Sequence, residues 1–148
     1  MKVRTPFVLL ACLTGCGGIP RDPESTLDHI RRDHVMRIGW VRGVDPNNSG
    51  HWQELVTRLA KATGSQPSIE HDALEPLLVM LEAGKLDMVV GGRFAEDTPW
   101  KTRVTLGPSF RTSTTANGTL SERAVARNGE NAWIIFTQRE AKALGASE

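Results

Sequence analysis

Apolar residues recur with the spacing of strands and helices between residues 35 and 92. Residues 35–41 are an apolar run followed by turn residues from Gly43 to Gly50, which predicts a first strand. In the next segment the apolar positions fall at i, i+3, i+4, i+7 and i+8, which predicts an amphipathic helix with Ser49 as its cap and Gly64 just past its end. These positions are Trp52, Leu55, Val56, Leu59 and Ala60.

The alternation continues with a second strand, a second helix and a third strand. Residues 68–71 predict a short strand, and the pair Asp72 and Glu75 resembles a capping box at the start of a helix. That helix carries leucines at helical spacing and ends at Gly84, and residues 86–92 follow as a strand with a centre that is apolar on both faces. The order predicts an α/β fold, a three-layer and mostly parallel sheet with flanking helices.

The second half of the chain predicts a hairpin and a terminal element. After residues 104–106 and a turn at Gly107-Pro108, the extended runs 110–115 and 123–126 flank Asn117-Gly118, a strong hairpin signal. Residues 132–144 predict a helix capped by Asn131, although the short apolar run 133–136 fits a strand equally well.

The first residues have the layout of a secretory signal peptide. Lys2 and Arg4 precede an apolar stretch over residues 7–13, and small residues follow it. The run 13–16, Leu-Thr-Gly-Cys, resembles the bacterial lipoprotein signal, in which Cys16 is lipidated and becomes the first residue of the mature chain. The alternative is a plain signal peptide that happens to contain a cysteine.

This layout divides the chain into three parts. We expect a lipoprotein signal peptide over 1–15, a tether over 16–33 and a single domain over 34–148, with Leu27 and Ile30 making a short helical turn within the tether. The expected location is periplasmic, with the membrane lipid attached through Cys16. Gly17 after the cysteine favours the outer membrane if the cell is Gram-negative.

Composition excludes several classes of function. The 148 residues carry a formal net charge of +1, which argues against a broad nucleic-acid-binding surface. The four histidines have no metal-ligand spacing, and no nucleophile elbow, HExxH motif or phosphate-binding glycine loop occurs. We therefore expect neither an enzyme, nor a metal site, nor a cofactor.

Four segments carry a resemblance to a known family. Residues 36–41, 52–60, 77–92 and 98–110 are similar in order and character to the first lobe of extracytoplasmic solute-binding proteins of the amino-acid-binding type, family 3, which have the periplasmic-binding-protein type II fold. The resemblance implies a single such lobe, because only 38 residues follow Phe110 and a second lobe has no room. Lys101 stands where the family has an arginine that clamps the ligand carboxylate, and residues 93–97 replace small hydroxyl-bearing positions.

The candidate ligand contacts follow from this comparison and from the predicted strand ends. Glycines at the carboxyl end of a parallel strand let a ligand approach the backbone. Cationic side chains pair with an anionic group of the ligand, and tryptophan rings line the side of a ligand cleft. Each also has a structural interpretation: a turn for the glycines, a solvated surface for the cations and a core position for the tryptophans. The candidates are Trp40, Gly91, Gly92, Trp100, Lys101 and Arg103.

Two functions are compatible with these features. In the first, the protein is a membrane-anchored lobe that binds a small polar or anionic, amino-acid-like solute in support of transport or sensing. In the second, it binds no ligand and is an accessory module that docks on a membrane transporter. A transporter subunit or a second copy of the chain is the expected protein partner.

Overall fold

The computed structural model describes residues 22–44 and 49–147. The signal peptide, Cys16 and the first part of the tether lie outside the described residues. The described elements are α1 (Thr26–Asp33), β1 (Val35–Val41), α2 (Gly50–Thr63), β2 (Gln66–Asp72), α3 (Leu74–Glu82), β3 (Met88–Ala95), the 3-10 helix η2 (Pro99–Thr102), β4 (Val104–Thr115), β5 (Gly118–Arg127) and α4 (Asn131–Ala143).

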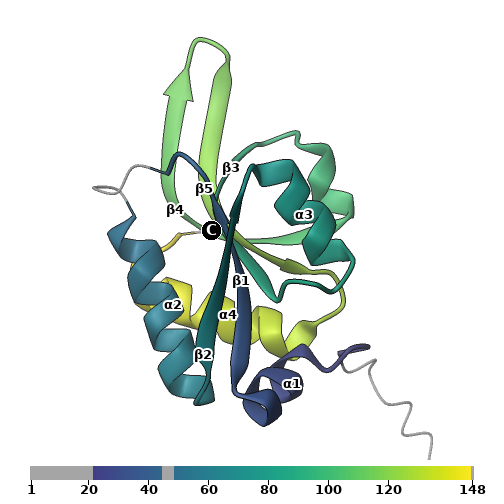
Figure 1. Ribbon diagram of the computed structural model, residues 1–148. Helices are drawn as coiled ribbons and strands as arrows, with labels where there is room; N and C mark the ends of the chain where they lie inside the picture. The colour runs from purple at the N-terminus through teal and green to yellow at the C-terminus, as the bar shows by residue number, and fades with distance from the viewer. Residues whose placement is uncertain (1–21, 45–48, 148) are drawn as a thin grey trace, which may run out of the picture.

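One five-stranded sheet forms the centre of the molecule, in the order β2-β1-β3-β5-β4 (Figure 1). β1 pairs in parallel with both β2 and β3, as the alternating pattern predicts. β5 is antiparallel to β3 and to β4, because the hairpin predicted at Asn117-Gly118 returns the chain between them. The α/β class and its parallel first half are thus confirmed.

Helices cover both faces of the sheet and enclose two apolar clusters. Val89 packs with the leucines of α3 on one face. Its neighbours Met88 and Val90 belong to the other face, which α1, α2 and α4 cover. Trp133 of α4 is fully buried and its indole Nε1 donates a 2.8 Å hydrogen bond to the carbonyl of Asp87. The alternating strand residues therefore hold the three layers together.

The tether predicted over 16–33 needs a correction, because its last part belongs to the folded domain. Residues 26–33 form α1, and Leu27 and Ile30 are buried against the sheet. The buried carboxylate of Glu130 accepts hydrogen bonds from the backbone N–H groups of Glu24 and Thr26. Two apolar side chains and the Glu130 carboxylate attach this short helix to the domain, so packing begins before residue 34.

The other differences concern element ends. β4 runs straight through the turn expected at Gly107-Pro108, with register shifts against β5 on either side of Ser109. β3 begins two residues and ends three residues later than predicted, and reaches Ala95. Residues 131–143 are a helix, so the strand interpretation of 133–136 is wrong, and the residue before the helix is Glu130 rather than Asn131.

Candidate functional site

A break in the ladder at Gly91 organises the carboxyl end of the sheet. β1 and β3 remain paired up to Trp40 and Val90, and the register between β3 and β5 shifts between Val89 and Gly92. Gly91 lies in this shift with φ +81°, a left-handed conformation that glycine adopts without strain. The chain therefore leaves regular pairing at the end of a parallel strand, where open α/β sheets bind ligands.

Beyond the break, β3 and β5 present different side chains on their two faces. Arg93 pairs with Glu122 across the ladder, and Phe94 pairs with Ser121. Because successive strand residues point to opposite faces, the ionic pair faces one side and Phe94 with Ser121 faces the other. The end of the sheet thus carries two separate depressions.

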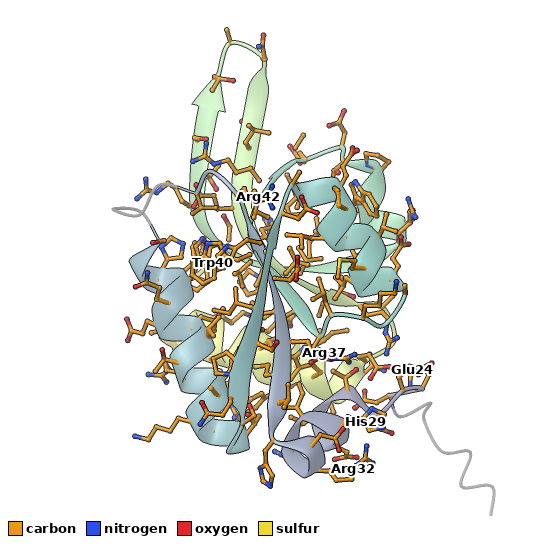
Figure 2. The ribbon with its side chains drawn as sticks, in the orientation of Figure 1. Glu24, His29, Arg32, Arg37, Trp40 and Arg42 are labelled. Atoms are coloured by element: carbon orange, nitrogen blue, oxygen red, sulfur yellow. The ribbon has the colours of Figure 1, made fainter. Side chains whose placement is uncertain are left out.

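We call the first depression the β1–β3 hollow. It has a volume of about 260 Å³ and lies where β1 ends and its pairing with β3 stops. Its polar lining is two guanidinium groups and one carboxylate, from Arg42, Arg93 and Glu122. The remaining lining residues are Val41, Gly43, Val44, Leu74 and Gly91. Figure 2 shows Trp40 and Arg42 toward the upper end of β1, the end at which the hairpin projects.

The ion pairs of the hollow differ in strength. Arg93 places both Nε and Nη2 at 3.0 Å from Oε1 of Glu122, whose side chain is only 6% exposed. Arg42 is 70% exposed, and its Nη1 lies 4.0 Å from Asp72 Oδ1. Arg93 is therefore committed to Glu122, whereas Arg42 keeps donors available to an incoming anion.

Behind the hollow, His51 packs among aromatic rings at the start of α2. Its ring stacks on Phe110 at a centroid distance of 4.7 Å and lies 4.6 Å from the ring of Trp52. Burial lowers the pKa of His51; the nearby Glu122 carboxylate opposes this shift and Arg111 adds to it. His51 is thus neutral at neutral pH.

The two glycines and Trp40 lie in different environments. Gly91 lines the β1–β3 hollow. Gly92 does not open toward solvent, because a Cβ there would lie 2.7 Å from the ring of Phe94 and 3.0 Å from Leu74. Trp40 packs half-buried against the larger core cluster, with its ring 6.3 Å from that of His71.

The three residues around η2 also separate from one another. Trp100 packs against the α3 cluster, and the guanidinium of Arg103 lies 4.3 Å from the centre of its ring. The same guanidinium pairs with Glu82, with Nε 2.8 Å from Oε1. Lys101 instead lines the second depression. The structure therefore does not bring the six predicted residues into one site.

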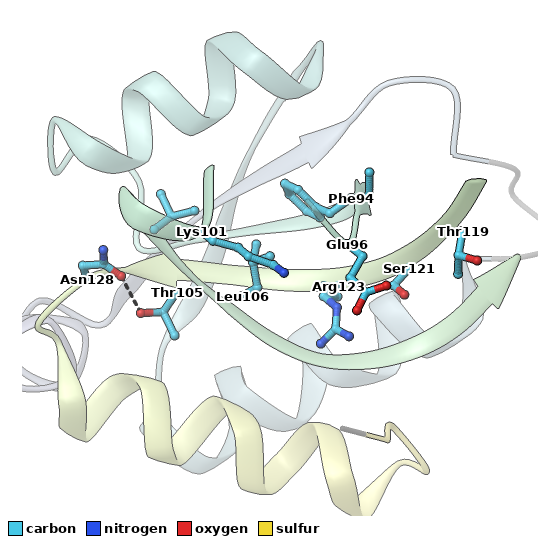
Figure 3. Close-up of a pocket in the computed structure, with 11 residues that line it drawn as sticks. Phe94, Glu96, Lys101, Thr105, Leu106, Thr119, Ser121, Arg123 and Asn128 are labelled. Atoms are coloured by element: carbon cyan, nitrogen blue, oxygen red, sulfur yellow. Dashed lines mark hydrogen bonds between the residues drawn. The ribbon is translucent and has the colours of Figure 1, made fainter. Parts of the chain in front are cut away.

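We call the second depression the β4–β5 groove (Figure 3). Its volume is about 510 Å³, and it lies on the face of the sheet to which Phe94 and Ser121 point. Its charged residues are Lys101 from η2, Arg123 from β5 and Glu96 just after β3.

The charged lining residues that were not among the six candidates include Arg42, Arg93, Glu122 and Arg123. Arg123 begins the extended run predicted over 123–126 and Glu122 directly precedes it, but the partners of both residues depend on the order β3-β5-β4. The sequence around Glu122, with Ser121 before it and Arg123 after it, does not signal burial, because the alternation of a strand does not reveal which of its faces is covered. Arg42 follows directly after the predicted first strand, a position that could have drawn attention to it.

Residues 22–44 and 49–147 hold no group of three or more His, Cys, Asp or Glu side chains that could bind a metal ion. In the same ranges no helix combines the length and apolar composition needed to cross a membrane.

Solved structures share the architecture. The arginine-bound form of domain 1 from TmArgBP superposes with a TM-score of 0.64 at 17% identity, covering 78% of this chain and 98% of that chain. An ancestral cationic amino acid solute-binding protein gives 0.65 at 12% identity, with 80% and 93% covered. The substrate-binding protein of an amino acid ABC transporter gives 0.61 at 11% identity, with 74% and 92% covered.

These similarities establish the fold. The chain has the architecture of a single lobe of periplasmic solute-binding proteins, as the four matching segments predict. No protein-family model matches the sequence, and no curated protein matches it.

Proposed function

We propose that this protein is a solute-binding lobe that captures a small polar or anionic, amino-acid-like solute in the β1–β3 hollow, in support of transport or sensing. The observation that carries this proposal is the exposed guanidinium group of Arg42, which lines the hollow beside the Gly91 break where the parallel pairing of β1 and β3 stops. A carboxylate pairs with the exposed fork of Arg42, and the backbone at Gly91 lets it approach closely. The solutes named for the similar lobes, arginine and cationic amino acids, also carry a carboxylate.

The size of the hollow sets the expected affinity. A volume of about 260 Å³ suits a small solute. Pockets that bind tightly enclose roughly 70–90% of the ligand surface, which one lobe with an open hollow does not achieve. We therefore expect weak binding unless a partner or a second copy supplies the opposite wall.

The binding test is a thermal-shift screen of the whole chain with amino acids and small carboxylates at millimolar concentration. A ligand that binds the folded state raises its stability by RT ln(1 + [L]/Kd), and therefore its Tm. Arg42→Ala should remove the shift, whereas Arg31→Ala, an exposed arginine on α1, should leave it unchanged. A screen without any Arg42-dependent shift contradicts the proposal.

Membrane attachment is a separate part of the proposal. Removal of the signal peptide and lipidation of Cys16 would hold the lobe at the outer face of a membrane, since several acyl chains together give firm binding. In cells, the protein should therefore sediment with membranes, and Cys16→Ser should release it into the soluble fraction. Equal membrane retention of both forms would exclude Cys16 as the anchor.

The alternative of a docking module is favoured by the β4–β5 hairpin. Residues 111–119 are all exposed, and the hairpin projects beyond the body of the molecule (Figure 1). Cross-linking in cells, with and without residues 113–118, tests this reading. Docking would be favoured over solute capture by two results together: shortening the hairpin removes a cross-linked membrane protein, and no solute shifts the Tm.

A further inference from the structure

We infer that β4 joins two copies of this chain, because its free edge in the β4–β5 hairpin pairs antiparallel with the same edge of a second copy. β4 is the last strand in the order β2-β1-β3-β5-β4, so along the hairpin only the edge that faces β5 is paired. Residues 111–119 are exposed, and Figure 1 shows the hairpin rising beyond the body of the molecule. The inference does not depend on solute capture in the β1–β3 hollow.

The ladder determines which backbone groups of β4 face the free edge. The two-residue turn of the hairpin makes Thr115 and Gly118 the closing pair, which exchanges hydrogen bonds. Hydrogen-bonded and non-hydrogen-bonded pairs alternate in an antiparallel ladder, so Ser113 also bonds to β5. The N–H and C=O groups of Thr112 and Thr114 therefore face away from β5.

The side chains of the hairpin agree with this assignment. Facing side chains approach more closely at non-hydrogen-bonded pairs than at hydrogen-bonded pairs. Oγ1 of Thr112 lies 3.3 Å from Oγ of Ser121, and Oγ1 of Thr114 lies 3.2 Å from Oγ1 of Thr119. Both threonines thus occupy positions whose backbone groups do not bond to β5.

The free edge begins beyond the point where the C-terminal segment covers β4. Ser109 and Ser147 exchange two backbone hydrogen bonds there, with N–H to carbonyl distances of 2.6 and 2.8 Å. Within residues 22–44 and 49–147, no strand pairs with this side of β4 at Thr112 or Thr114. Their backbone groups are therefore available to a further strand, and such an edge is a template for pairing with another chain.

The two edges of the sheet differ in their protection against such pairing. The opposite edge strand, β2, carries Pro67 and the carboxylates Glu70 and Asp72. Proline and charged side chains keep edge strands from pairing with other chains. Residues 112–121 instead contain neither proline nor charge and are rich in threonine, which favours strands. The β4 edge is therefore the one that admits a partner.

A second copy fits this edge because the edge is complementary to itself. Two-fold antiparallel pairing centred on Ser113 places Thr112 opposite Thr114 of the second copy, and it uses the outward backbone groups of both threonines in both copies. Arg111 then lies opposite Thr115 of the second copy, so no like charges meet, and facing threonines add favourable contacts. The pairing buries little surface, so we expect a weak and reversible dimer.

Sedimentation velocity of the whole chain measures this association. Over about a hundredfold range of concentration, monomer should give way to dimer by mass action. Ser113→Lys sets two ammonium groups opposite each other and should weaken the dimer about fivefold, the repulsion of like charges about 4–5 Å apart in water. Thr119→Lys adds the same charge to the exposed surface of β5, away from the free edge, and should leave the dimer intact.

Two further variants separate the edge from other surfaces. Thr114→Pro removes an N–H that faces the free edge and no bond to β5, so it should abolish the dimer. Ser113→Lys keeps the test if Thr114→Pro disturbs the hairpin. Arg42→Ala should leave the dimer unchanged even where it removes a solute-dependent shift, so this inference and solute capture fail independently.

A cysteine cross-link tests the register. The chain with Cys12→Ser and Cys16→Ser has no thiol of its own. In this background Ser113→Cys should form a disulfide between copies, because facing residues at a non-hydrogen-bonded pair have Cα atoms about 4.5 Å apart. That separation lies within the disulfide range of roughly 4.4–6.8 Å. Thr119→Cys, on the other strand of the hairpin, should not form one.

Three results would overturn the inference. The first is a monomer at every concentration. The second is a dimer that Ser113→Lys and Thr114→Pro form as tightly as the unmodified chain, which would place the contact on another surface. The third is a disulfide yield from Ser113→Cys no greater than that from Thr119→Cys, which would exclude the antiparallel pairing of the two edges.

Discussion

The Nε2 atom of His51 lies 3.9 Å from Oε2 of Glu122, and both atoms are buried without a hydrogen-bond partner. This distance is too long for a hydrogen bond. Burial lowers the pKa of His51 despite the neighbouring carboxylate, so the folded protein resists protonating this ring. A titratable group is thus held neutral directly behind the β1–β3 hollow.

We predict that His51 makes the protein less stable as the solution is acidified. The unfolded chain binds a proton at His51 near pH 6.5, whereas the folded chain does so only at lower pH. As pH falls through 6.5 toward the folded pKa, the unfolded state gains protons that the folded state does not, and stability falls by at most about 1.4 kcal/mol per pH unit. Urea unfolding between pH 7.5 and about 5 measures this slope.

The variant His51→Gln isolates the contribution of this ring. Its stability should vary less with pH in that window than the stability of the unmodified protein. Gln53→Ala is the matched control, because Gln53 is exposed on the same helix and carries no titratable group, so it should leave the slope unchanged. Parallel pH profiles for the unmodified protein and His51→Gln would contradict the prediction.

Glu130 is predicted to hold the N-terminal segment on the domain. Its buried carboxylate accepts hydrogen bonds from the N–H groups of Glu24 at 3.0 Å and Thr26 at 2.9 Å. Glu130→Ala leaves these donors unpaired and should lower the free energy of unfolding by about 2–4 kcal/mol. Hydrogen exchange of the α1 amides should rise most, because this anchor is local to α1. Asp28→Ala, an exposed change in the same helix, should cost less than about 1 kcal/mol.

The same carboxylate adds a second, more acidic pH dependence. Burial raises the pKa of Glu130, but the hydrogen bonds from Thr26 and Glu24 and the charge of Arg127 lower it more, so the net shift is downward. Its stabilisation is therefore complete above the ordinary glutamate pKa and is lost as pH falls through the lower folded value. Unfolding measured below about pH 4.5 should show this loss in the unmodified protein and not in Glu130→Gln.

Gly91→Ala should destabilise the protein by about 1–3 kcal/mol. The residue has φ +81°, and a Cβ there would lie 2.6 Å from Cγ2 of Val44. Gly50→Ala is the matched control: nothing lies within 4 Å of its Cβ position at the start of α2, so the change should be neutral or slightly stabilising. Thermal unfolding of both variants checks the difference, and equal Tm values would contradict it.

Arg103→Ala should have only a small effect on stability, below about 1 kcal/mol. Its guanidinium pairs with Glu82 and lies over Trp100, but its side chain is 52% exposed. Because these partners already engage it, the same variant should not change solute binding in the β1–β3 hollow. If calorimetry shows that Arg103→Ala loses solute binding, Arg103 contacts the solute and the prediction is wrong.

A structural feature could be predicted from the sequence where the residues that determine it are close together in the chain. The helices over 50–63 and 74–82 and the strands β1 and β3 follow from apolar spacing, because a buried face repeats at the period of its own element. The hairpin at Asn117-Gly118 follows from turn chemistry, since these residues adopt the required conformation readily. The extent of β4 through Pro108 and the packing of α1 were not predictable, because each depends on partners far along the chain, β5 and Glu130.

The sequence by itself determined the α/β alternation, the glycines that follow the parallel part of β3 and the cations that come after them along the chain. Only the tertiary structure decided which of these residues meet. The register of β5 against β3 placed Arg93 and Glu122 on one face and Phe94 and Ser121 on the other, and so separated Gly91 from Lys101. The physical reason is the two-residue period of a strand. A shift of one residue in the pairing register moves every side chain to the other face of the sheet, and the local composition of a strand does not reveal which register forms.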